Sequence, residues 1–198
     1  GWGRPTMKGI EYTTEHGKQS YKMIPTREGD STVVYPSAIS SVADETYFFN
    51  LPLFNKNSSQ NVQHRVILNS TPIQTILRNI LEKNAILTTN YISSIKPLIT
   101  EVENQLIVSS HSPIILGAYD QSGNFTGIDP NQDLSAEILS ITENIPGSTF
   151  LYTSESQYIF LPKEGTYNFV YKGVGNGPTT VEIESFSGNV STPIVQYS

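Results

Sequence analysis

The sequence of 198 residues predicts an α+β to mainly β protein built from two unlike parts. Two observations lead to this class. Residues 1–97 mix extended segments with a single strong helix pattern. Residues 101–198 carry short β-branched and aromatic runs between turns rich in Gly, Pro and Asn, which predicts an antiparallel β-sandwich. We therefore expect two domains, 1–97 and 101–198.

In the first part, two Tyr-rich and β-branched runs, Met7–Thr14 and Gln19–Thr26, predict a β-hairpin. Glu45–Leu51 reads as a further apolar strand, and the polar residues Asn55–Asn61 read as a loop.

The helix signal follows that loop. Thr71 is a favourable N-cap, Pro72 fits the first helical position, and Asn84 can end the helix in a left-handed conformation. One face carries the apolar residues Ile73, Ile76, Leu77, Ile80 and Leu81. We expect this face and Tyr47–Leu51 to remain uncovered, because two or three strands and one helix cannot cover both faces of a mainly parallel sheet.

The second part holds most of the predicted strands and no convincing helix. The expected core residues are Ile107, Ile115, Leu116, Tyr119, Phe160, Phe169 and Ile183. The expected strands are Gln105–Ser110, Pro113–Tyr119, Phe125–Ile128, Ala136–Thr142, Gln157–Leu161, Thr166–Lys172, Thr179–Phe186 and Ser191–Tyr197.

Composition excludes several classes of function. The chain has 12 basic and 18 acidic residues, a net charge of −6, which argues against nucleic acid as a partner. No apolar run approaches the roughly 20 residues of a transmembrane helix. The absence of cysteine removes disulfides and thiolate chemistry. No motif indicates a cofactor, and the start at Gly1 without a signal pattern leads us to expect a processed or partial chain.

Two short motifs carry the chemistry. Gly29-Asp30-Ser31-Thr32-Val33 places a carboxylate in a turn, and Val62-Gln63-His64-Arg65-Val66 places an imidazole before the helix. Taken singly, Asp30 is a common turn residue and His64 a common surface or capping residue. Taken together, an Asp followed by a His matches the last two members of a Ser…Asp…His triad. No Gly-x-Ser-x-Gly motif occurs to supply the first member.

These motifs resemble those of lecithin:cholesterol acyltransferase-like and related lipase-like α/β hydrolases. The resemblance covers residues 1 to about 84 and includes the hairpin region Pro5–Thr26. It departs at Ser31, where Gly is usual, and at Val34-Tyr35, where Pro is common nearby. It implies a C-terminal fragment of a hydrolase sheet acting on ester bonds, with Asp30 and His64 as catalytic residues. The nucleophile and oxyanion hole would lie in a catalytic half upstream of Gly1, so this chain alone would be inert.

The second part resembles a β-sandwich module of secreted bacterial proteins. The likeness rests on Ser112–Leu116, Tyr119–Gly127, Ile145–Ser148 and Gly165–Phe169. It implies an extracellular or cell-surface location. An alternative to the enzyme is a structural or adhesive β-protein, whose exposed strand edges would join copies of the chain into oligomers or filaments.

An acidic segment is a candidate calcium site. Asp120, Asn124, Asp129 and Asp133 offer oxygen ligands, although their spacing does not match an EF-hand loop. The alternative is that these residues form turns.

Overall fold

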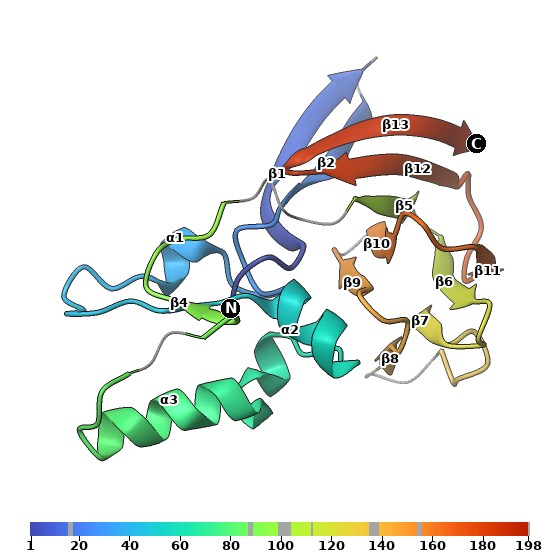
Figure 1. Ribbon diagram of the computed structural model, residues 1–198. Helices are drawn as coiled ribbons and strands as arrows, with labels where there is room; N and C mark the ends of the chain where they lie inside the picture. Colours follow the sequence, from blue (N-terminus) through green and yellow to red (C-terminus); the bar gives the residue numbers. More distant parts are fainter. Residues whose placement is uncertain are drawn as a thin grey trace. The chain divides into compact units, whose positions relative to one another are not determined.

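The computed structural model describes residues 1–15, 18–86, 89–98, 104–111, 113–134, 139–153 and 156–197. The chain divides into two compact units, Gly1–Glu101 and Val102–Ser198. The described residues are mostly β-structure in several antiparallel sheets, with few helices (Figure 1), so the predicted mainly β class is confirmed. None of the described helices combines the length and apolar character needed to cross a membrane.

The first unit begins with the predicted hairpin, which is confirmed. Strands β1 (Thr6–Glu15) and β2 (Lys18–Thr26) pair antiparallel, with an irregularity in register between Met7 and Gly9. The remaining elements are α1 (Tyr35–Ala38), β3 (Phe48–Phe49), α2 (Leu51–Ser58), the 3₁₀ helix η1 (His64–Asn69), α3 (Thr71–Leu81) and β4 (Ile92–Ser93).

The region from Glu45 to Asn61 differs from the prediction. Strand β3 spans two residues, and helix α2 occupies much of the stretch expected to be a loop. Asn50 causes the change, because its side chain accepts a hydrogen bond from Leu53 N at 3.1 Å and so caps the helix. Pro52, which lies in the first turn, also favours a helix start.

The core of the first unit gathers around β3. Phe49, Leu51, Phe54, Val62, Ile76 and Ile92 form one buried cluster. The prediction that Tyr47–Leu51 would be uncovered is therefore wrong for Phe48, Phe49 and Leu51, which are 8%, 2% and 0% exposed. Among the described residues of this unit, parallel pairing is confined to the isolated bridges Trp2–Asn50 and Arg4–Asp30.

Helix α3 lies where the apolar period predicts it, with small differences at its ends. Ser70 is the N-cap, Thr71 is the first helical residue, and Lys83 takes the left-handed conformation expected of Asn84. Ile76 is buried at 8% exposure, whereas Leu77, Ile80 and Leu81 are 44%, 51% and 83% exposed. Three of the five apolar residues on this face are thus exposed, as predicted, whereas Ile76 is covered and Ile73 is partly covered.

The described residues of the second unit form two antiparallel sheets. One has the strand order β13-β12-β5-β10-β9 and the other has the order β11-β6-β7-β8. The strands are β5 (Gln105–His111), β6 (Ile114–Asp120), β7 (Phe125–Ile128), β8 (Ile141–Glu143), β9 (Thr149–Tyr152), β10 (Ser156–Pro162), β11 (Tyr167–Gly173), β12 (Thr180–Ser187) and β13 (Val190–Tyr197). The sequence prediction missed β9. Its strand over Ala136–Thr142 falls partly on residues 135–138, outside the described residues.

Both sheets contribute to a common core. Its buried members are Val108, Ile115, Leu116, Ala118, Ile128, Ile145, Phe150, Ile159 and Leu161, with Phe169 and Ile183 partly buried against them. Ile115 and Leu116 were correctly predicted. Ile107 and Phe160 are also buried, but β-strand alternation places them on the other face of the five-stranded sheet, where Phe160 contacts Phe186 edge-on at 5.6 Å. Tyr119 is only partly buried and packs on Phe125 at 4.7 Å.

Candidate functional site

The turn that carries Asp30 is built by contacts on both sides of it. A β-carbon at Gly29 would lie 2.5 Å from Thr6 Oγ1 and 2.7 Å from Val33 O, so a larger residue would not fit. Ser31 has φ of 81°, a conformation that favours glycine. Its backbone N–H donates to Thr6 Oγ1 at 3.0 Å, and Arg4 Nε donates to its hydroxyl at 3.3 Å. These bonds hold a serine where the resembled family usually has glycine.

The Asp30 carboxylate is buried, at 6% exposure for the residue, and each of its oxygens has a separate task. Oδ1 accepts hydrogen bonds from the backbone N–H of Val33 at 2.9 Å and of Thr32 at 3.3 Å. Oδ2 lies 2.9 Å from His64 Nδ1. Oδ1 therefore stabilises the turn, and the geometry of the turn directs Oδ2 toward the imidazole.

His64 is held in place by its own backbone as well as by its ring. Its N–H donates to Asp30 O at 3.0 Å, and it is the first residue of η1. The loop before it is clamped by buried Asn55, whose side chain donates to Val62 O and accepts from Val62 N, both at 2.9 Å. The expected approach of Asp30 and His64, 34 residues apart, is confirmed.

The geometry sets the chemistry available to the imidazole. An ionised carboxylate only accepts hydrogen bonds, so Nδ1 carries the proton and Nε2 presents a lone pair. The His64 side chain is 45% exposed, and within the described residues Nε2 has no hydrogen-bond partner. The dyad can therefore take a proton from a donor group that comes within hydrogen-bond distance of Nε2.

Several supporting residues escaped the sequence analysis. Thr6 and Arg4 are far from Asp30 in sequence and reach its turn through the parallel bridge between Arg4 and Asp30 and through their hydrogen bonds to Ser31. Asn55 lies in the polar stretch that predicts a loop. The sequence Asn50-Leu51-Pro52 could have revealed helix α2, because an Asn cap followed by Pro in the first turn is typical of a helix start. A helix that starts there contains Asn55.

The calcium candidates form turns. Asp120 Oδ1 accepts from the N–H of Ser122 and Asn124 at 2.9 and 2.8 Å, and Asp129 Oδ1 accepts from Asn131 N at 2.8 Å. Burial opposes ionisation of Asp120, but hydrogen bonds from Asn124 and from nearby backbone outweigh it and lower the pKa of this carboxyl. Among the described residues, no group of three or more His, Asp or Glu, with Asp133 included, is placed to hold a metal ion.

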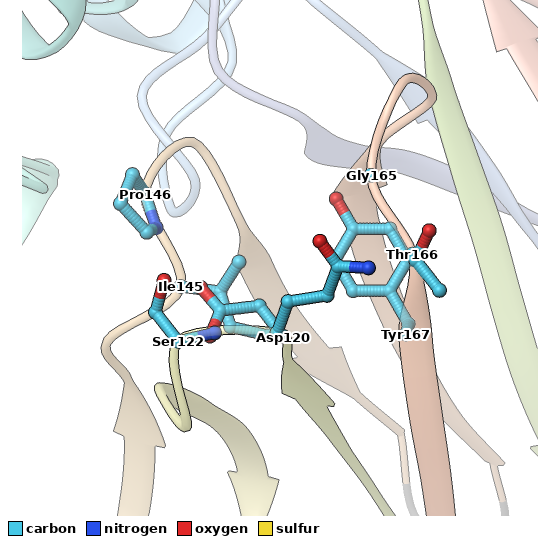
Figure 2. Close-up of a pocket in the computed structure, with 8 residues that line it drawn as sticks. Asp120, Ser122, Ile145, Pro146, Gly165, Thr166 and Tyr167 are labelled. Atoms are coloured by element: carbon cyan, nitrogen blue, oxygen red, sulfur yellow. The ribbon is translucent and has the colours of Figure 1, made fainter.

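A cavity of about 230 Å³ lies beside Asp120, between three loops of the second unit (Figure 2). Ser122, Pro146 and Gly165 contribute to its wall, and the Tyr167 hydroxyl donates to Pro162 O at 2.7 Å. Burial, followed by the negative charge of Asp120, raises the pKa of Tyr167 to about 12. The phenol therefore stays protonated at neutral pH and serves as a structural hydrogen-bond donor.

His111 Nδ1 lies 2.9 Å from Ser156 Oγ within the second unit, and His16 lies outside the described residues. Comparison of the chain with protein-family models, with curated proteins and with solved structures finds no match.

Proposed function

We propose that residues 1–97 are the C-terminal part of a secreted bacterial serine α/β hydrolase of the esterase, lipase or acyltransferase kind, followed by a β-sandwich module. The observation that carries the proposal is the 2.9 Å contact between Asp30 Oδ2 and His64 Nδ1. Turn Asp residues and surface His residues are each common, but a buried carboxylate that fixes the tautomer of a half-exposed imidazole is the arrangement of a triad acid and base.

In this proposal His64 acts on a serine from an upstream catalytic half. As the serine oxygen attacks the acyl carbon, its proton passes to His64 Nε2, and the same proton then passes to the departing alcohol. Water then repeats the sequence: its oxygen attacks the acyl-serine while its proton passes to Nε2, and that proton returns to the serine oxygen as the bond to the acid breaks. Asp30 stays ionised throughout and stabilises the imidazolium.

The exposed face of helix α3 supports the need for additional chain. Leu77, Ile80 and Leu81 are each more than two-fifths exposed, and Leu68 in η1 is 63% exposed. Burying an aliphatic side chain of this size contributes about 1.5–3 kcal/mol, so covering this surface would stabilise the unit substantially. The catalytic half, or another copy of the chain, would supply that cover.

The test uses the full gene product isolated from its native source. We expect a fluorophosphonate probe to label a serine upstream of Gly1, and His64→Ala to abolish both labelling and ester hydrolysis. His111→Ala is the matched control, because its ring also forms a hydrogen bond but lies outside the dyad. A product without an upstream nucleophile motif, or one whose hydrolysis survives His64→Ala, would refute the proposal.

The chain alone should show no ester turnover, because a His–Asp pair without a nucleophile lacks the covalent step. Hydrolysis that persists through purification and disappears on His64→Ala would mean that a serine within this chain, such as Ser31 or Ser37, is the nucleophile.

The second candidate function is self-assembly of an extracellular structural or adhesive protein. Strand β13 favours it, because this strand forms an edge of the five-stranded sheet and exposes Val190, Ile194 and Tyr197. Light scattering over a hundredfold range of concentration tests it. Assembly that is lost on Ile194→Lys supports this function, and a monomer at all concentrations excludes it.

A further inference from the structure

A cluster of aromatic rings around Trp2 forms a rigid wall in the first unit. Trp2 is 2% exposed and meets Tyr35 and Phe48 edge-on, both at 5.6 Å between ring centroids. Tyr35 and Phe48 lie 5.5 Å apart. Backbone hydrogen bonds fix Trp2 on both sides of its peptide, from its N–H to Phe49 O at 2.9 Å and from Leu51 N to its carbonyl at 3.0 Å.

A carboxylate stands beside this wall. Tyr35 N donates to Glu28 O at 2.7 Å, which ties the backbone of Glu28 to that of Tyr35. Glu28 is partly exposed, with 27% of its side chain accessible. Aromatic faces and a carboxylate together make the environment that best attracts an organic ammonium ion, because the ring quadrupoles and the negative charge act on the same cation.

The chain itself places an ammonium group there. Lys96 Nζ lies 4.6 Å from the ring centroid of Tyr35, 5.2 Å from that of Trp2 and 2.9 Å from Glu28 Oε1. Lys96 belongs to the segment after β4, where the Ser93 hydroxyl bonds to the Ile95 backbone and where Ile95 and Leu98 are both 77% exposed. The Lys96 side chain is itself 42% exposed. Backbone hydrogen bonds therefore hold Trp2 and Tyr35 in place, whereas the lysine that lies against their rings is partly exposed to solvent.

We propose that Trp2, Tyr35 and Glu28 form a binding site for a small organic ammonium ion, which Lys96 occupies in the free chain. A ligand with a methylated amine would displace Lys96 and lie against the two rings with its charge toward Glu28. None of these residues belongs to the Asp30–His64 dyad, and the site does not depend on the hydrolase proposal.

The single tryptophan of the chain is the reporter, because Trp2 itself forms part of the site. We would titrate the intact Lys96→Ala variant with tetramethylammonium chloride and follow Trp2 emission, with sodium chloride at equal ionic strength as the reference. We expect saturable quenching with a half-point on the order of 10 mM. The unmodified chain should need at least about fivefold more ligand, because its tethered Lys96 competes at millimolar effective concentration.

Three variants sharpen the test. Glu28→Gln and Tyr35→Ala, each combined with Lys96→Ala, should weaken binding about fivefold or more. The first removes the negative charge of the site and the second removes one of its two rings. Lys172→Ala is the matched lysine control, because Lys172 Nζ donates to Pro130 O in the second unit, and it should respond like the unmodified chain.

A measurement on the unmodified chain keeps the test independent of how the variants fold. Ring currents from Trp2 and Tyr35 shift the NMR signals of the Lys96 ε-methylene, and tetramethylammonium should move them toward those of an exposed lysine. The proposal is overturned if these signals stay fixed. It is also overturned if sodium chloride quenches Trp2 as strongly in a folded Lys96→Ala variant, or if that variant and the unmodified chain respond equally.

Discussion

Substitution of Asp30 by Asn or by Ala separates the two tasks of its carboxylate. Asn keeps an oxygen that accepts from the N–H groups of Val33 and Thr32 but turns an NH₂ group toward His64. Ala removes both contacts. The turn should therefore survive Asp30→Asn and be weakened by Asp30→Ala, while the imidazole should be affected by both.

The magnitudes follow from the contacts. Asp30→Ala leaves two backbone N–H donors and one ring N–H without their acceptor, in a region where the carboxylate is largely buried. Hydrogen bonds to charged groups contribute about 1.5–3 kcal/mol each, and water compensates part of that loss at half-exposed His64, so we expect a loss of about 2–4 kcal/mol. Asp30→Asn should cost about 1–2 kcal/mol, because the bonds to the turn are kept while the charged contacts of Oδ2, to His64 at 2.9 Å and to the Gly1 ammonium at 3.8 Å, are lost.

The assay combines urea unfolding with nitrogen NMR of the imidazole. In the unmodified chain, the neutral His64 ring should carry its proton on Nδ1. In Asp30→Asn, the amide donates instead of accepting, so the proton should move to Nε2. Equal destabilisation by Asn and Ala, or an unchanged tautomer in Asp30→Asn, would refute the inference that Oδ1 stabilises the turn and Oδ2 orients the imidazole.

Three further predictions concern packing and ionisation. Ile76→Ala should lower the free energy of unfolding by about 2–4 kcal/mol and Ile80→Ala by under about 1 kcal/mol, because the two residues share a helix but are 8% and 51% exposed; equal losses in urea unfolding would show that a second copy covers the helix. The phenol of Tyr167 should titrate near pH 12 when its absorbance is followed at 295 nm. After allowance for solvent screening, its raised pKa should add about 1 kcal/mol to the free energy of unfolding, which is present below pH 10 and lost as the pH rises through about 12. A Tyr167→Phe variant with unchanged alkaline unfolding would contradict this. Residues 103–198 expressed alone should unfold cooperatively because both sheets share one core, whereas 1–97 alone should associate or unfold; a monomeric, cooperatively folded 1–97 fragment would remove the need for a partner.

Local pattern was enough to predict the hairpin, helix α3 and most strands of the second unit. Periodicity and turn residues act over a few residues, so they are legible without tertiary information. The dyad could also be predicted, because Asp30 and His64 follow one another in the chain order of a Ser…Asp…His triad and each lies in a short motif. Helix α2 was missed because a single cap at Asn50 outweighed the aromatic run before it.

Tertiary structure alone decided the rest. The parallel bridge between Arg4 and Asp30 brings Thr6 and Arg4 to a turn about 25 residues away and holds Ser31 at positive φ. The ammonium of Lys96 reaches Glu28 across 68 residues, a contact that no local pattern announces. Sequence order constrains neighbours along the chain, whereas contacts of this kind depend on which distant segments the fold places side by side.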